Sequence, residues 1–398
     1  MKPEYDIFIS GAGIAGLAAA AVFGASGHRV LIVDPAPPET SESDPAADLR
    51  TTAFLQPARG IMERAGIWDA LAPHTTPLRT LRVIDCSGAR PTARTRRDFE
   101  AGDISEAPFG WNIPNWRSRS ILADTLSSME RVDLRLGTGF AALHLRDDIA
   151  RIRLSDGSSI AARLCLAADG RGSPVRSAMG IGTKTTRYGQ KALAFAVTHE
   201  IPHDEVSTEI YHRGGAFTLV PLPDYDNRPS SAVVWMEDAR AAMELTDLPE
   251  DAFNDRATER STGVLGPLRK VGGVRTWPII TQVADRLTQP RAALLAEAAH
   301  VMPPIGAQGL NTSLQDVRAL ADAIEAHPGD PGAPAVLAAY ARARQGDIRA
   351  RAAVIDVYNR ICRSGAPPIQ ALRSAGLRLV HDIAPLRRTI MGAGLGRL

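Results

Sequence analysis

Cysteine is scarce in this chain. The three cysteines, Cys86, Cys165 and Cys362, lie far apart in 398 residues and form no CxxC pair. Their number and spacing argue against a disulfide framework and against structural zinc. We expect each of them to be a small buried residue in a protein kept in a reducing compartment.

The chain also lacks a strong charge, clusters of aromatic and basic residues, and long apolar runs. Its formal net charge of +2 is too small for a general nucleic-acid binder, and its aromatic residues, 5% of the chain, form no stacking platform among basic residues. No uninterrupted apolar stretch reaches the roughly 20 residues needed to cross a bilayer. The N-terminus lacks the basic, apolar and cleavage-site series of a signal peptide. We therefore expect no nucleic-acid partner and a protein that is cytoplasmic, or peripheral at the inner membrane surface.

The N-terminal region carries the strongest pattern. A strand, a glycine turn with the sequence Gly-Ala-Gly-Ile-Ala-Gly, an apolar helix and a second strand follow one another between residues 5 and 34. Gly11 makes the tight turn, Gly13 lets the backbone approach a pyrophosphate, and Gly16 lets the helix pack on the strand. Asp34 stands where an acid accepts hydrogen bonds from a ribose diol. The pattern predicts an adenine dinucleotide site, and the alternative is a glycine-rich turn that only packs.

Two kinds of region alternate along the rest of the chain. Buried strands at 164–168 and 291–296 suit a parallel sheet, whereas 186–284 holds short alternating runs separated by Pro, Gly and Asp, which is typical of an antiparallel sheet. A helical stripe covers 59–71. We predict an α/β fold in three parts: a discontinuous, Rossmann-like dinucleotide domain (1–75, 112–185 and 285–340), an inserted antiparallel β-rich substrate domain (76–111 and 186–284), and basic amphipathic C-terminal helices (341–398).

Further motifs narrow the class. They are Ala-Asp-Gly-Arg-Gly-Ser-Pro-Val-Arg at 168–176, Glu-Ala-Ala-His-Val-Met-Pro-Pro-Ile-Gly-Ala-Gln-Gly-Leu-Asn at 297–311, Asp-Leu-Arg-Thr-Thr-Ala at 48–53, and the tail at 376–387. With the glycine turn, these residues resemble the FAD-dependent aromatic hydroxylases of the para-hydroxybenzoate hydroxylase fold. Within that group the chain is most similar to the ubiquinone-biosynthesis hydroxylases, over essentially its whole length.

The resemblance implies a set of FAD-binding residues. The amides of the turn that begins at Pro304 would face the flavin pyrimidine, where the dipole of the following helix stabilises negative charge. Asp169 would lie by the flavin pyrophosphate, in a motif also linked to nicotinamide-nucleotide use. Arg50 and Arg119 match arginines near the cofactor, although a solvated or salt-bridged side chain is the alternative for each. The expected cofactor-binding residues are Gly11, Gly13, Gly16, Asp34, Arg50, Arg119, Asp169, Glu297, Pro304, Gly309, Leu310 and Asn311.

The chain departs from the family pattern at two places. The usual Gly-Asp before Ala-Ala-His is Ala296-Glu297, and the usual Ala-Gly after Pro-Ile is inverted to Gly306-Ala307. Glu297 still has a carboxylate that accepts a hydrogen bond from a ribityl hydroxyl. Ala307 must adopt the backbone conformation of a glycine, or the turn must shift by one residue. We expect FAD to bind nevertheless.

The implied activity is hydroxylation. Only one dinucleotide fingerprint is present, so NAD(P)H has no separate folded site. The resemblance implies that NAD(P)H or another electron donor reduces FAD, that O2 then forms a flavin hydroperoxide, and that this hydroxylates the aromatic ring of a polyprenylated phenol in ubiquinone biosynthesis. A hydroxylase of a small soluble aromatic compound and a non-catalytic flavoprotein scaffold of a biosynthetic complex are the alternatives.

No catalytic acid or base is assigned from the sequence. His199, Tyr211 and His212 fall on strands expected to roof the pocket, but a structural role is the alternative for each, as it is for Trp235. The ExxH pairs at 297–300 and 200–203 have di-iron spacing, yet the bridging carboxylates of partner helices are missing, so we predict no metal site. Trp-Asn-Ile-Pro at 111–114 matches half of a flavin-halogenase signature, but no lysine occurs between Lys2 and Lys184 to hold the halogenating species.

The C-terminal region is basic. Residues 341–398 hold eleven arginines against three aspartates, interleaved with leucine and isoleucine. Such a region suits anionic lipid headgroups, as in a peripheral membrane contact, or an acidic partner in a biosynthetic complex. A solvated helix face is the alternative.

Overall fold

The N-terminal strand lies at the centre of a mostly parallel sheet. The computed structural model describes residues 3–41, 50–88 and 90–395. In it β1 pairs in parallel with β2 on one side and with β11 on the other, and β8 and β18 continue the sheet in parallel. Antiparallel β17 and the hairpin β9–β10 complete it. Its strands are β1 (Tyr5–Ser10), β2 (Val30–Asp34), β8 (Val132–Leu136), β9 (Phe140–Leu145), β10 (Ala150–Leu154), β11 (Ser159–Ala167), β17 (Thr288–Gln289) and β18 (Ala292–Leu294).

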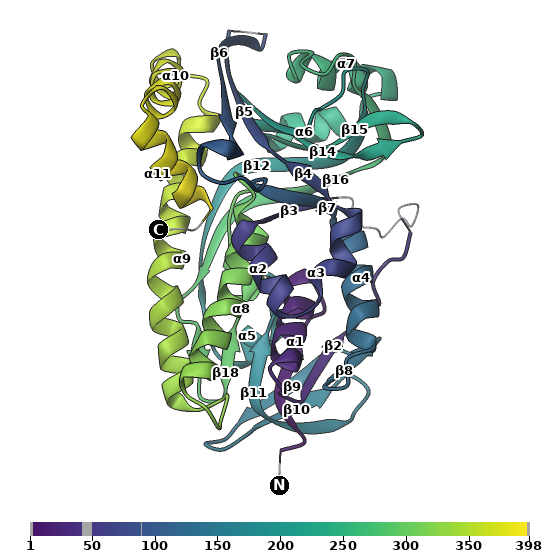
Figure 1. Cartoon of the computed structure of the whole chain (residues 1–398), viewed down its shortest axis with the longest axis vertical. Coiled ribbons are helices and arrows are strands. Elements are labelled where there is room, and N and C mark those ends of the chain that lie inside the picture. The colour runs from purple at the N-terminus through teal and green to yellow at the C-terminus, as the bar shows by residue number, and fades with distance from the viewer. Residues whose placement is uncertain (1–2, 42–49, 89, 396–398) are drawn as a thin grey trace.

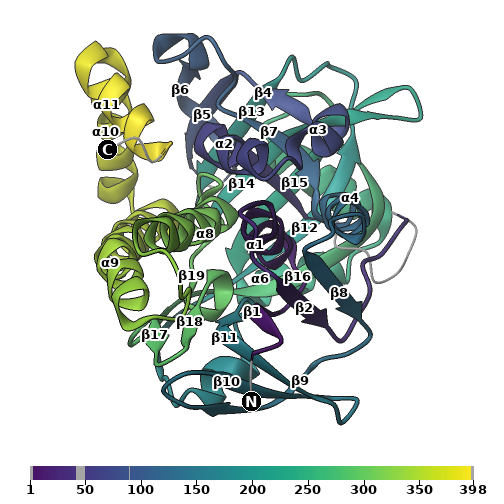
Figure 2. The ribbon, with the colours of Figure 1, turned by 60° about the horizontal axis from the view of Figure 1, so that its bottom comes forward.

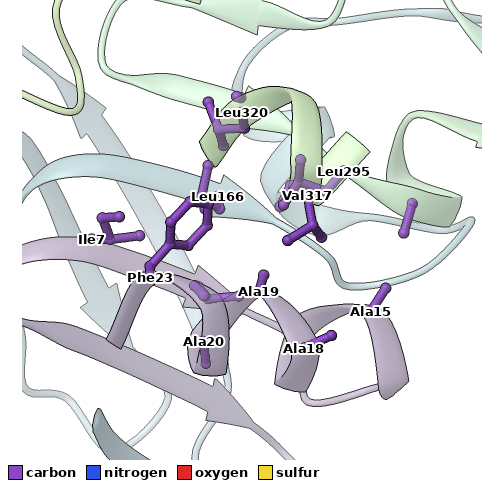
Figure 3. Packing of buried hydrophobic residues seen from close by; sticks show 14 of the residues in the cluster. Ile7, Ala15, Ala18, Ala19, Ala20, Phe23, Leu166, Leu295, Val317 and Leu320 are labelled. Atoms are coloured by element: carbon purple, nitrogen blue, oxygen red, sulfur yellow. The ribbon is translucent and has the colours of Figure 1, made fainter. Parts of the chain in front are cut away.

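Helix α1 (Ile14–Ala25) packs tightly because its buried face is built from alanine. Ala18 and Ala19 are fully buried between the sheet and α8 (Gln308–Ala326), and such short side chains let the helix axes approach closely. Phe23 fills the remaining space, next to Leu166 of β11 and Leu320 of α8 (Figure 3). This packing fixes the start of α1, and therefore the glycine turn, relative to both β1 and α8.

A second large sheet lies above the first (Figure 1). Its strand order is β19-β16-β12-β15-β14-β13-β5-β6, antiparallel except where β13 runs parallel to β5. The predicted antiparallel sheet therefore includes β5 and β6 from an earlier part of the chain. Its strands are β5 (Thr80–Ser87), β6 (Thr92–Glu100), β12 (Thr183–Thr198), β13 (Val206–His212), β14 (Gly215–Tyr225), β15 (Arg228–Asp238), β16 (Arg269–Ala284) and β19 (His300–Val301).

Helices cover one face of this second sheet. Leu245 of α6 (Ala239–Thr246) and Phe253 of α7 (Glu250–Arg260) share a core with Phe195 and Trp235 of the sheet. Trp235 is therefore a core residue. The opposite face, which carries Tyr211 and Val234, turns toward the C-terminal helices.

A small sheet connects the two large ones. It consists of β3 (Thr51–Leu55), β7 (Gly110–Pro114) and β4 (Thr76–Leu78), in the order β3-β7-β4. The helix predicted over 59–71 is interrupted, because Gly66 adopts a φ of 69°. The neighbouring helices are α2 (Gln56–Arg64), α3 (Trp68–Leu71) and α4 (Asn115–Ser127), whereas α5 (Pro174–Ala178) packs beside β9.

Three helices end the described chain. α9 (Pro334–Arg363) runs along the outside of α8, and α10 (Pro367–Asp382) and α11 (Ala384–Gly394) fold back beside β5 and β6 (Figures 1 and 2). No helix in the described part of the chain is both long enough and apolar enough to cross a membrane. The α/β fold class is confirmed, and the division into domains stays a prediction.

Candidate cofactor and substrate site

A cavity of about 1830 Å³ is lined by both large sheets and by the C-terminal helices. Gly13 and Asp34 lie on it at the glycine turn, Val83 and Val220 on the second sheet, and Leu377 on α10. Sites for one drug-sized ligand occupy about 300–1,000 Å³. The cavity therefore has room for a dinucleotide together with a second ligand.

The three glycines of the turn have different physical reasons for lacking a side chain. Gly11 has a φ of 105°, and a Cβ there would lie 2.4 Å from the carbonyl oxygen of Ala168. A Cβ on Gly16 would lie 2.0 Å from the carbonyl oxygen of Gly11. A Cβ on Gly13 would meet no protein atom within 4 Å, and Gly13 lines the cavity. Gly11 and Gly16 thus keep the turn tight, whereas Gly13 keeps cavity space free beside the backbone.

Two helices begin at the cavity without a side-chain cap. Gly13 is the N-cap of α1 and Ala307 is the N-cap of α8, and neither end receives a hydrogen bond from a capping side chain. The first amides of a helix have no partner within the helix and attract negative charge. Both helix starts are therefore suited to a ligand with phosphate or electron-rich ring oxygens.

Asp34 and Arg119 brace the glycine turn. Asp34 Oδ2 accepts a hydrogen bond from the Ala12 amide at 2.7 Å, and the Arg119 Nε donates to the Ala12 carbonyl oxygen at 2.9 Å. A second Arg119 nitrogen, Nη2, lies 3.4 Å from Asp34 Oδ1. Arg119 thus forms a salt bridge, which was the alternative to a place near the cofactor. It also lines the cavity, so it positions the glycine turn from within the site.

Arg50 and Trp277 lie together on the cavity wall. The Arg50 guanidinium carbon is 5.2 Å from the centre of the Trp277 ring, within cation–π range. Asp48 and Leu49, which precede Arg50 in its motif, lie outside the described residues. Trp277 was missed at the sequence level, because a single tryptophan in a strand does not distinguish a site wall from a core.

Asp169 presents a buried oxygen to the site. It follows β11, and its Oδ2 accepts a hydrogen bond from the Val175 amide at 3.2 Å. Its Oδ1 is buried and has no hydrogen-bond partner among the described residues. Burial raises the pKa of Asp169, although hydrogen bonds from Ser173 and Val175 oppose this. A ligand hydroxyl or amide would satisfy the unpaired acceptor.

Both segments in which the chain departs from the family pattern contain an alanine with a left-handed backbone. Ala307 has a φ of 54° and Ala296 a φ of 55°, so alanine adopts a conformation that glycine normally supplies, at a cost of about 1–2 kcal/mol each. Gly306 is left-handed as well, with a φ of 60°. The turn therefore keeps both residues in this conformation, and Glu297 is exposed on the cavity beside Ala296.

A buried ionic cluster supports the Ala296 segment. Asp316 Oδ2 accepts hydrogen bonds from the Ala296 amide at 3.0 Å and from His300 Nε2 at 2.7 Å. Its Oδ1 accepts from Arg344 Nε at 2.7 Å. His300, the histidine of one ExxH pair, therefore has a structural partner, and His203 of the other lies 2.9 Å from the Leu222 carbonyl oxygen.

Asn311 is the one predicted site residue that does not line this cavity. Its side-chain nitrogen donates to the Ala53 carbonyl oxygen at 2.8 Å, and its side-chain oxygen accepts from the Leu55 backbone amide at 2.9 Å. These bonds fasten β3 to the start of α8. The other eleven predicted residues, including Pro304, Gly309 and Leu310, lie on the cavity.

A buried polar network stands in the otherwise apolar part of the cavity. The Tyr211 hydroxyl donates to Glu209 Oε2 at 2.5 Å, and both residues are buried. The ring of Tyr358 on α9 packs edge-on against the Tyr211 ring, with the ring centres 5.8 Å apart. Burial raises the pKa of Glu209, opposed by the bonds from Tyr211 and Gly306. The network thus lies on the second sheet and contacts α9 through Tyr358.

Sequence reasoning found only part of this network. Glu209 lies two residues before Tyr211 on β13, and side chains two apart on a strand share a face, so alternation was the signal for Glu209. Tyr358 had no such signal. His199 and His212 are buried and bonded elsewhere, His199 to Ser231 at 2.9 Å and His212 to the Gly88 carbonyl oxygen at 2.9 Å. The three cysteines are buried, as expected.

Comparisons with known proteins agree with this geometry. The pattern of the family described as FAD binding domain matches residues 4–354. The ubiquinone hydroxylase UbiL of Rhodospirillum rubrum is 32% identical, over 99% of this chain and 90% of that protein. The 3-demethoxyubiquinol 3-hydroxylase of Escherichia coli is 26% identical, over 98% of both. The crystal structure of p-nitrophenol 4-monooxygenase from Pseudomonas putida has the same fold, with a TM-score of 0.80, 18% identity and 99% of each chain covered.

These matches identify the class. The chain belongs to the FAD-binding family that includes the Rhodospirillum ubiquinone hydroxylase, and it is an FAD-dependent monooxygenase. Its own residues fit the cofactor, because the space beside Gly13 and the two uncapped helix starts open on one cavity, which Asp169 also lines.

Proposed function

We propose that this protein hydroxylates the aromatic ring of a polyprenylated phenol in ubiquinone biosynthesis, with FAD as cofactor and NAD(P)H as electron donor. The observation that carries the proposal is the large cavity, which continues from the glycine turn into an apolar chamber lined by Val83, Val220 and Leu377. The names of the Rhodospirillum and Escherichia coli relatives support the pathway.

The chain's own residues divide the work. We propose that Gly11, Gly13 and Gly16 admit the pyrophosphate beside α1, with Asp34 near the ribose, and that the amides of Gly309 and Leu310 face the flavin ring. Bound FAD would supply the oxygen-activating chemistry. The apolar chamber would exclude water from the reacting ring.

The network of Glu209, Tyr211 and Tyr358 is our candidate for binding the phenol hydroxyl. Glu209 and Tyr211 are buried on the wall of the cavity, and Gly306 of the second glycine turn lines the same cavity. A phenol is a better nucleophile when its proton is partly transferred, and a carboxylate reached through a tyrosine hydroxyl is a suitable acceptor for that proton.

A small aromatic acid is less well served by this cavity. Such a substrate would favour a buried arginine for its carboxylate, and Arg373 does line the cavity. However, Arg373 is paired with Asp85 and donates to the carbonyl oxygens of Cys86 and Cys362. Each of its three guanidinium nitrogens therefore already donates within the protein. The non-catalytic scaffold is also less well supported, because Ala296 and Ala307, where the chain departs from the family pattern, keep the left-handed backbone.

We also propose that the C-terminal region contacts an anionic lipid surface. Many of its arginines are used internally, such as Arg344 with Asp316 and Arg387 with Asp103. Arg378 and Arg388 are exposed and have no carboxylate partner in the described part of the chain. If the purified protein fails to sediment with anionic liposomes at low salt, this contact is wrong.

The quinone profile of cells that lack the gene tests the function. Mass spectrometry of lipid extracts should show less ubiquinone and an accumulated prenylated intermediate that is short of ring oxygen. Re-expression of the wild-type gene should restore the profile, and the Gly13→Ala variant is the matched control for cofactor dependence. Normal ubiquinone in a strain without another ring hydroxylase would contradict the proposal.

A further inference from the structure

Exposed apolar side chains form a stripe on α9 that leads into the cavity. Val354, Val357 and Tyr358 are 68%, 56% and 38% exposed. Together with Ile361 they share one face of the helix, because residues three, four and seven apart align. Tyr358 and Ile361 also line the cavity. The stripe therefore runs from solvent to the cavity wall.

α10 and α11 contribute apolar residues of the same kind. Leu372 of α10 is 66% exposed and Ile390 of α11 is 43% exposed, and both line the cavity. We call Tyr358, Ile361, Leu372 and Ile390 the mouth, because each lines the cavity and none is buried.

Gln308 shows that α9 and α11 approach each other at one end of the mouth. Its side-chain nitrogen donates to the Gly394 carbonyl oxygen at 3.1 Å, and its side-chain oxygen accepts from Arg351 Nη1 at 3.2 Å. Arg351 lies one helical turn before Val354. The stripe on α9 thus begins beside the end of α11, and Figure 1 shows the two helices side by side there.

Polar contacts, not the apolar residues of the mouth, hold α10 to the second sheet. Arg97 of β6 pairs with Asp382 at 3.0 Å, and the Ser374 and Thr95 hydroxyls lie 2.6 Å apart. The buried pair of Arg373 and Asp85 adds a third attachment. These contacts leave Leu372 of α10 exposed, and Ile390 of α11 is exposed as well, although covering both side chains would be favourable.

We propose that the prenyl chain of the substrate passes through this mouth, between the cavity and a lipid surface. The inference rests on the proposed function. The cavity must hold both FAD and the aromatic ring, so a long prenyl chain has to leave it, and an opening with an apolar rim spares that chain from crossing water. The exposed Arg378 and Arg388 on the same two helices suit anionic headgroups around such an opening.

Two substrates with one phenol head test the proposal: one carries a polyprenyl chain in anionic vesicles, and the other carries a methyl group instead. The test variants are Leu372→Glu and Ile390→Glu, and Ile201→Glu is the matched control, because Ile201 is 49% exposed and lies off the cavity. We expect the test variants to raise KM for the prenylated phenol about tenfold or more, with FAD content and turnover of the methyl compound unchanged. The control should match the wild type.

Three outcomes would overturn the proposal. Unchanged KM for the prenylated phenol in both test variants refutes the mouth, as does an equal loss with both substrates. Binding of the test variants to substrate-free anionic vesicles at the wild-type level refutes the lipid surface. A wild-type enzyme with equal kcat/KM for both phenols refutes the prenylated substrate itself, and the mouth with it.

A photoreactive prenylated phenol gives an independent readout. With a diazirine at the end of its chain, irradiation should label peptides of α9, α10 or α11. Labelling confined to the second sheet or to the parallel sheet would place the prenyl chain elsewhere and contradict the mouth.

Discussion

Replacing Gly13 with alanine should separate cofactor binding from folding. Gly13 has an ordinary φ of −70°, so alanine adopts the same backbone without strain, and the added Cβ meets no protein atom within 4 Å. Alanine is a poorer N-cap than glycine, which costs the apoprotein no more than about 1 kcal/mol. The fold of Gly13→Ala should therefore persist.

The cofactor should respond differently, because the added methyl group occupies cavity space beside the first amides of α1. If it keeps the pyrophosphate from one charge-assisted hydrogen bond, the loss is about 1.5–3 kcal/mol. Since each 1.4 kcal/mol is about tenfold in Kd, FAD should bind roughly 10- to 150-fold more weakly. A flavin fluorescence titration of the apoprotein measures this directly.

Gly16→Ala is the matched control, three residues further on. Its Cβ would lie 2.0 Å from the Gly11 carbonyl oxygen, a backbone atom that cannot rotate away. Helix α1 must then move from β1, and overpacking of this kind costs about 1–3 kcal/mol or more. Urea unfolding of both apoproteins compares the two. Wild-type FAD affinity in Gly13→Ala, or an apoprotein as destabilised as Gly16→Ala, would refute the reasoning.

Three other substitutions test further parts of the site. Glu209→Gln should keep FAD but slow hydroxylation about 100-fold. Because burial raises the pKa of Glu209, the activity of the wild type should decrease on acidification, with a midpoint above about pH 4.3. The variant should lack this decrease, so a pH profile equal to that of the wild type argues against the role. Asp316→Asn leaves Arg344 and His300 without their carboxylate and should cost about 3–5 kcal/mol at pH 7 by urea unfolding. Burial raises the pKa of Asp316, but His300 and Arg344 outweigh it and hold the pKa below its usual value, so the wild-type advantage should be full above about pH 4 and shrink at lower pH; equal urea midpoints at pH 7 would contradict this. Ala307→Gly relieves a left-handed alanine and should raise the free energy of unfolding by about 1 kcal/mol, so a lower thermal midpoint would be unexpected.

Local sequence signals located the glycine-rich end of the cavity. The glycine turn, Asp34 and the start of α8 are each encoded within a few residues, so their positions on the cavity followed from the sequence. The alanines at 296 and 307 were the uncertain points, and the structure resolves them through backbone conformation. The residues that hold the Ala296 backbone are distant in sequence. Asp316 and Arg344 lie on two later helices.

The substrate end depended on contacts that no local pattern carries. Strand β6 contains three arginines and alternates poorly, yet it pairs along β5, where Arg82 and Asp98 form an ion pair at 2.9 Å. The basic C-terminal region was interpreted as a surface, and its apolar residues also wall the cavity. Amphipathic periodicity shows that a helix has an apolar face, but not which other element that face meets.

The helices and strands that line the cavity follow one another along the chain, and their order determines which part of the site can fold first during translation. The glycine turn, β11 and the start of α8 all precede α9, so the elements around the cofactor are complete before α10 and α11 are translated. Proteins generally fold in the order in which they emerge, at about 5–20 residues per second. A growing chain of this enzyme therefore acquires its dinucleotide cradle first, and its substrate chamber closes only when α11 leaves the ribosome.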